Sequence, residues 1–144
     1  MQDRPTAIEL LEAGAEFLER EVAPICEGAL RYKARVAANV LRIVAREIDL
    51  GERHLREEAE DLAALLGEAP PRARGDRALR EEVVRLNCLL GERIRTGEMD
   101  SGVGRSRVLQ ALRKMAVRKL EVANPRYLEL VRPRSGPGPR RGPS

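Results

Sequence analysis

Four polar side chains recur every three or four residues within the sequence KARVAANVLRIVARE: Arg35, Asn39, Arg42 and Arg46. On a helix this spacing places them on one face. Guanidinium groups bind phosphate and carboxylate groups through paired hydrogen bonds, so the row could form an anion site. Rows of this kind also serve as solvated faces or pair with acidic helices. The acids available for such pairing are Glu12, Glu16 and Glu19, and both interpretations stay open.

A second polar group, residues 124–127, directly follows the last helical segment. One interpretation is a helix end with a proline stop, with Tyr127 folding back onto the bundle. The other is a polar pocket completed together with Lys119. We expect Asn39 to lie close to residues 124–127, because both interrupt apolar helical material with groups that need partners. The candidate ligand-binding residues are Arg35, Asn39, Arg42, Lys119, Asn124, Arg126 and Tyr127.

Residues for catalysis or metal binding are scarce. His54 is the single histidine. The chain therefore offers no Ser-His-acid or Cys-His pair unless a partner supplies residues, and it has no internal multi-histidine metal site. Cys26 and Cys88 lack the spacing of a metal or redox motif, and we expect them to be reduced core residues. The sequence predicts no catalytic residue, no metal and no cofactor.

Composition favours a single all-α domain. Aromatic residues make up 2% of the 144 positions, and the apolar content is mostly the aliphatic residues of packed helices. The net charge of +4 equals the four arginines of residues 132–144, which contain no acid. The body is therefore neutral, which argues against a nucleic-acid partner. We predict a helical bundle domain over residues 1–131 and a disordered, basic Pro/Gly/Arg-rich tail over residues 132–144.

About five helices can be placed by periodicity and end signals. Thr6 and Glu9 form a capping-box pattern that begins the first helix, and Pro24 ends it. Gly51 is a natural stop for the second helix and Gly67 for the third. The apolar positions of the second helix should be the most buried in the chain. The four later helices are predicted at about residues 27–50, 52–66, 76–94 and 105–123.

The N-terminal sequence carries acids throughout and lacks the basic and apolar regions of a secretory signal. No apolar run approaches the roughly 20 residues of a membrane span. We therefore expect a cytoplasmic protein without a membrane partner. The sequence does not define an oligomeric state.

Three spaced segments carry a resemblance to a known family: QDRPTAIELLEAGAEFLERE, LRYKARVAANVLRIVARE and VRKLEVANPRYL. Over positions 2–128 the chain resembles a bacterial family of small helical proteins of unknown function. The resemblance implies genes beside phosphotransferase-type, aminoglycoside-kinase-like proteins and acyl-CoA dehydrogenases. It implies no activity and no catalytic residues.

Together these observations predict a non-enzymatic accessory or interaction protein. Its expected partner is a phosphotransferase-like kinase or an acyl-CoA-using enzyme. The alternative is a small anion-binding protein or enzyme that recognises a phosphate or acyl-CoA-like ligand through the basic polar pocket. The two hypotheses differ in whether the polar residues bind a ligand or only stabilise the fold.

Overall fold

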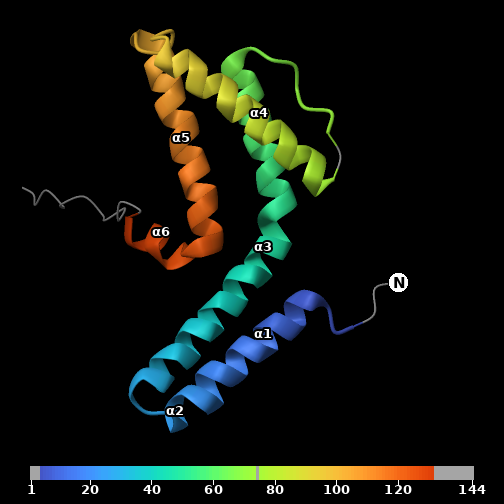
Figure 1. Cartoon of the computed structure of the whole chain (residues 1–144), viewed down its shortest axis with the longest axis vertical. Helices are drawn as coiled ribbons and strands as arrows, with labels where there is room; N and C mark the ends of the chain where they lie inside the picture. The colour runs from blue at the N-terminus through green and yellow to red at the C-terminus, as the bar shows by residue number, and fades with distance from the viewer. Residues whose placement is uncertain (1–3, 74, 132–144) are drawn as a thin grey trace, which may run out of the picture.

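The computed structural model describes residues 4–73 and 75–131. Figure 1 shows an elongated all-α arrangement, which confirms the predicted fold class. The helical elements are α1 (Ala7–Phe17), the π-helical segment η1 (Leu18–Val22), α2 (Ala23–Ile25), α3 (Gly28–Leu66), α4 (Asp76–Arg95), α5 (Gly102–Ala123) and α6 (Pro125–Val131). None of the helices in the described ranges is long and apolar enough to cross a membrane.

The long helix α3 corrects the predicted break at Gly51. A single helix of 39 residues runs through this position and ends only at Gly67, which adopts a left-handed conformation with φ of 72°. Glycine within a helix costs about 1 kcal/mol relative to alanine, an amount that packing along both halves of α3 can offset. Gly51 is buried inside the helix. A glycine therefore ends a helix here only where the chain needs a positive φ.

The first predicted helix begins as expected but ends differently. Thr6 and Glu9 form the expected reciprocal capping box at the start of α1. Pro24 does not stop the helix at once, because the chain continues through η1 into α2. A proline removes a backbone donor and crowds the preceding turn, and the wider π-helical turn relieves that crowding. The N–H of Ala23 accordingly bonds to the carbonyl of Leu18, five residues back.

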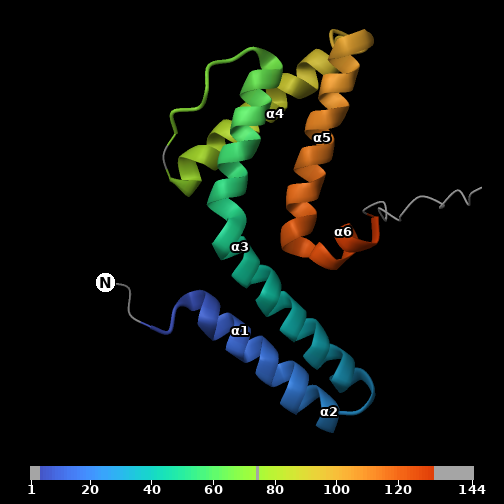
Figure 2. The same cartoon turned by 180° about the vertical axis from the view of Figure 1, so that it is seen from behind.

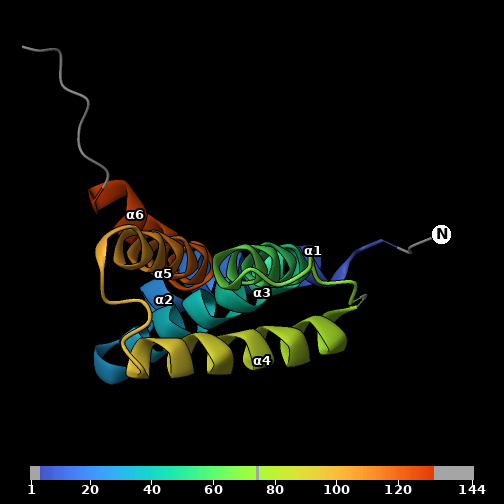
Figure 3. The same ribbon diagram turned by 90° about the horizontal axis from the view of Figure 1, so that it is seen from above.

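The main hydrophobic core joins the second half of α3 to α4 and α5. Figure 3 shows α5 beside α3, with α4 lying across one side of this pair. Leu62, Leu79 and Leu86 are completely buried. The core cluster comprises Ala59, Leu62, Ala63, Leu65, Leu66, Val83, Leu86, Leu90, Val108, Ala111 and Met115. The expectation that residues 27–50 hold the most buried apolar positions is therefore wrong.

The first half of α3 instead packs against α1 through small side chains, as Figures 1 and 2 allow the reader to follow. Leu41 is half-buried and lies 3.3 Å from where a Cβ of Gly14 would be. Small residues let two helix backbones approach closely, and the fully buried residues of this interface are accordingly all alanines. The buried residues of this interface are Ala15, Ala23, Ala34, Ala38 and Ala45.

Two further expectations concern the ends of the chain and the cysteines. Cys88 is exposed and Cys26 is half-buried, so the core assignment of Cys88 is wrong. The predicted disordered tail at residues 132–144 lies outside the described residues.

The position of the core predicts where truncation is costly. Replacing Leu86 with alanine should lower the free energy of unfolding by about 2–5 kcal/mol, because the cavity left in a packed core cannot fully collapse. The matched variant Leu109→Ala, at an exposed position of α5, should cost less than about 1 kcal/mol. Urea denaturation followed by circular dichroism measures both values. Equal losses in the two variants would contradict the assignment of the core.

Candidate functional site

A basic cleft lies where the first half of α3 meets the end of α5 and the start of α6. Figure 2 shows the end of α5 and α6 on one side of α3, and α1 on the other. The cleft has a volume of about 590 Å³. It contains four arginines and one acid. Its lining residues are Glu19, Arg35, Asn39, Arg42, Arg46, Ala123, Asn124, Pro125 and Arg126.

Two of the arginines are used to hold helices together. Arg42 donates a hydrogen bond to the Glu19 carboxylate, and its Nε lies 3.9 Å from Oε2 of Glu12. Arg46 Nε donates to the carbonyl of Val122, 2.7 Å away, in the last turn of α5. That carbonyl belongs to a helix end, where no partner is available within the helix. Pairing with the acidic first helix is thus the role of Arg42.

The other two arginines line the cleft from two different helices. Arg35 projects from α3 and Arg126 from α6, and both are exposed. Within residues 4–73 and 75–131, neither makes an ion pair within 4.0 Å of a carboxylate. Asn39 and Asn124 add two amides to the lining. The cleft therefore keeps an excess of positive charge together with neutral hydrogen-bond donors, a combination suited to an anion.

The positive charge of the cleft changes the pKa of Glu19. The hydrogen bond from Arg42, together with its charge, lowers the pKa of the Glu19 carboxyl below its usual value. Both effects of Arg42 exceed the opposing effect of desolvation, and the charges of Arg126 and Arg20 add smaller contributions in the same direction. Glu19 is therefore ionised at neutral pH and neutralises one of the four arginines.

The structure brings together five of the predicted site residues and separates the other two. Arg35, Asn39, Arg42, Asn124 and Arg126 share the cleft, as expected from the polar interruptions of the sequence. Asn39 is exposed at the surface of the cleft.

Lys119 and Tyr127 lie elsewhere. Lys119 projects from α5 about one turn before the cleft and lines a second cavity, while Tyr127 on α6 lines neither cavity. Ala123, four residues after Lys119 on the same face of α5, borders both cavities, so Lys119 lies one turn beyond the edge of the cleft. Glu19 was missed as a cleft residue, although the acidic pattern of the first helix had marked it as a partner for the arginines.

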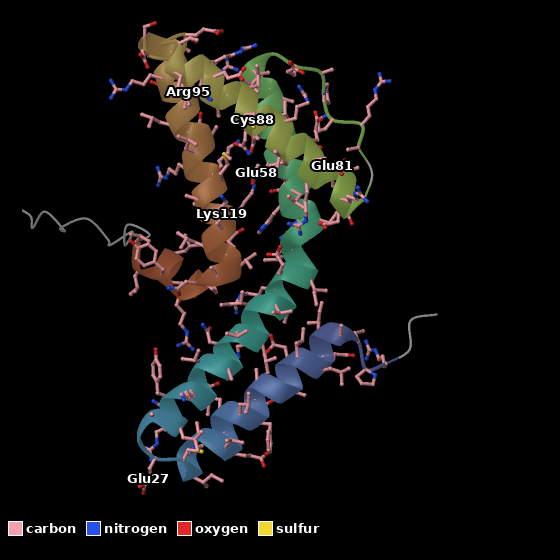
Figure 4. All side chains as sticks on the ribbon, in the orientation of Figure 1. Glu27, Glu58, Glu81, Cys88, Arg95 and Lys119 are labelled. Atoms are coloured by element: carbon pink, nitrogen blue, oxygen red, sulfur yellow. The ribbon has the colours of Figure 1, made fainter. Side chains whose placement is uncertain are left out.

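The second cavity, of about 350 Å³, lies between α3, α4 and α5. Figure 4 labels Glu58 on α3 and Lys119 on α5, which belong to its two sides. The buried His54 places Nε2 at 3.1 Å from Oε2 of Glu121. Arg118 is held by Glu57 and Asp61 through hydrogen bonds. Opposite charges are paired or balanced around this cavity, which gives it no preference for an anion over a cation.

The described parts of the chain contain no group of three or more His, Cys, Asp or Glu side chains placed to hold a metal ion.

The ion pair between Arg42 and Glu19 predicts how the pKa of Glu19 changes when Arg42 is replaced. Because its pKa is lowered in the folded chain, the pair stabilises the fold above the usual pKa of about 4.5, and this contribution is lost as the pH falls through the lowered value. In the variant Arg42→Gln the pKa of Glu19 should rise, as measured by carbon-detected NMR titration. In the control Arg20→Gln it should rise less, because Arg20 contributes only a weaker charge effect. An unchanged pKa in Arg42→Gln would refute the pairing.

Comparison with known proteins places these residues in a family. No curated protein and no solved structure matches the chain. The model of one protein family, described as "Domain of unknown function (DUF6285)", matches residues 24–127. That range contains all of α3, α4 and α5, together with every predicted site residue, and omits α1 and η1. The chain therefore belongs to the DUF6285 family, whose matched region holds both sides of the basic cleft.

Proposed function

We propose that the chain is a non-enzymatic accessory protein that binds a phosphate-bearing small molecule in the basic cleft. The observation that carries this proposal is the pair of exposed guanidinium groups, Arg35 and Arg126, which line one cleft from two different helices without a carboxylate partner among the described residues. Such groups repel each other unless an anion lies between them.

The chemistry of the lining favours phosphate over a single carboxylate. A phosphate accepts paired hydrogen bonds from more than one guanidinium at once and carries up to two charges. The amides of Asn39 and Asn124 can donate to the remaining oxygens. The volume of about 590 Å³ exceeds that of a phosphate group. A phosphate attached to a larger organic group, such as an acyl-CoA-like compound, would fill it better.

The binding role is favoured over catalysis by the groups that line the cleft. Its one acid, Glu19, is held by Arg42 and is kept ionised by this contact. A general base must have a pKa near the working pH and reach the reacting proton. Histidine is the side chain that most often acts as a general base, but His54 lies in the second cavity against Glu121. A binding protein needs neither group.

The proposed partner is a phosphotransferase-like kinase or an acyl-CoA-using enzyme, and the proposed location is the cytoplasm. Both enzyme classes handle small molecules that carry phosphate groups, which is the chemistry the cleft would recognise. An accessory protein with such a cleft could present or retain a phosphorylated compound for the enzyme. This part of the proposal is supported by ligand chemistry and by the family resemblance.

Ligand binding is tested by thermal protection with inorganic pyrophosphate and, separately, with coenzyme A. A ligand at 100 times its dissociation constant stabilises the folded chain by about 2.7 kcal/mol, which raises the melting temperature. The variants Arg35→Gln and Arg126→Gln should remove this protection and leave the melting temperature without ligand unchanged. Arg77→Gln is the matched control, because this arginine lies on α4, away from the cleft, with a side chain that is 93% exposed. It should retain full protection.

The outcomes separate the hypotheses. Equal loss of protection in Arg77→Gln would indicate nonspecific ion binding, and no protection of the wild type by either compound would refute the cleft as a phosphate site. Phosphorus NMR of the incubated compounds tests the non-enzymatic role, which requires that they remain unchanged.

A separate prediction concerns Asn39. Because this side chain is exposed, Asn39→Ala should change the free energy of unfolding by less than about 0.5 kcal/mol. A structural lock would require a loss of about 1–3 kcal/mol through an unsatisfied buried partner. Chemical denaturation measures the difference. In the ligand experiment the same variant should weaken pyrophosphate binding, and a stable variant with unchanged binding would remove Asn39 from the site.

A further inference from the structure

The basic cleft already contains an anionic group of the protein itself. Glu19, in the π-helical segment η1, is the only carboxylate among the described residues that line the cleft. This carboxylate accepts a hydrogen bond from Arg42, and the charge of Arg126 also acts on it. Two of the guanidinium groups that a ligand anion would meet therefore interact with Glu19 before any ligand binds.

Glu19 reaches the cleft from a different part of the chain than the other lining residues. Those residues belong to α3 and to the junction of α5 and α6, and all of them lie within the range 24–127 that the family model matches. Glu19 precedes that range and follows α1. The basic groups of the cleft thus come from the matched region, and the acid that neutralises one of them comes from the segment before it.

The pair between Glu19 and Arg42 is open to solvent. The Glu19 side chain is 47% exposed and the Arg42 side chain is 28% exposed. Exposed ion pairs contribute little to stability, because water solvates both charges when they separate. The helices α1 and α3 also pack through buried alanines such as Ala15 and Ala38. The Glu19 side chain can therefore turn away from Arg42 while the two helices stay together.

A ligand anion and Glu19 compete for the same donors. Nη2 of Arg42 donates to the Glu19 carboxylate, and a phosphate in the cleft would accept from the same kind of group. Two negative groups beside one guanidinium repel each other. The lowered pKa of Glu19 keeps its carboxylate ionised at neutral pH, so the competition is present under ordinary conditions.

We propose that Glu19 is a built-in competitor of the ligand, which holds Arg42 until an anion displaces it. This inference rests on the proposed function of the cleft as a phosphate site. In the bound state Arg42 joins Arg35 and Arg126 in contacting the anion. The Glu19 side chain then turns toward solvent. Because coupling between two binding events is reciprocal, any change that releases Glu19 strengthens anion binding.

Isothermal titration calorimetry of the full chain with inorganic pyrophosphate tests the competition. Glu19→Gln keeps the length of the side chain and removes its charge. The dissociation constant of pyrophosphate should fall about tenfold in this variant, because neither an ion pair nor a charge repulsion then opposes binding.

Glu16→Gln is the matched control. It removes the same charge from α1, where Glu16 pairs with Arg20 and does not line the cleft. The dissociation constant should change less than about twofold, since the charge lost is not in contact with the ligand. Circular dichroism should show that both glutamine variants are folded.

A double-mutant cycle tests whether Glu19 acts through Arg42. In the background Arg42→Gln, the change Glu19→Gln should tighten pyrophosphate binding less than about threefold, because the donor for which the two anions compete has been removed. The same tenfold gain in both backgrounds would show that Glu19 acts only through its charge at a distance, which would overturn the displacement of Glu19 from Arg42.

Failure of this inference is distinguishable from failure of the proposed function. If pyrophosphate binds neither the wild type nor Glu19→Gln, the cleft is not a phosphate site and both proposals fail. If the wild type binds and Glu19→Gln binds no more tightly, the proposed function stands and the competition is refuted. An equal gain in Glu16→Gln and Glu19→Gln would also refute it, because a general loss of negative charge would then explain the tighter binding.

Discussion

The continuity of α3 is the constraint on which the rest of the structure depends. This helix of 39 residues, about 58 Å long, contacts α1 along its first half and α4 and α5 along its second. A helix of this length in water is held by its packed faces more than by intrinsic propensity. Here the faces differ in kind, with alanines in the first half and a leucine-rich core in the second. The basic cleft lies at the junction, where the end of α5 reaches the first half of α3.

The distribution of arginine partners explains how a nearly neutral body acquires a basic cleft. Arg42 and Arg118 pair with acids on other helices, and Arg46 binds a carbonyl at the end of α5. These contacts fasten α1 and α5 to α3. Arg35 and Arg126 project into the cleft without such acids among the described residues. The positive charge of the cleft thus results from the way the helices pack, and the amino-acid composition alone does not indicate it.

The candidate site was predictable where local polarity was unusual for its surroundings. Asn39 and residues 124–126 interrupt apolar helical segments, and the structure places them in one cleft. Lys119 and Tyr127 are near these residues in sequence, but the structure places Lys119 one turn beyond the cleft, in the second cavity, and Tyr127 outside both cavities. The contact between the buried His54 and the partly exposed Glu121 joins two positions 67 residues apart. No local pattern indicates which acid the histidine will meet.

The sequence by itself determined the helical class, the Thr6 capping box and the end of α3 at Gly67, because helix ends are governed by side chains within a few residues. Tertiary structure decided that Gly51 lies within a helix and that Ala34, Ala38 and Ala45 are buried while Val40 is exposed. The physical reason is that apolar residues cover more than half the circumference of this segment. Periodicity then allows several faces to be buried, and only the available partner helices select among them.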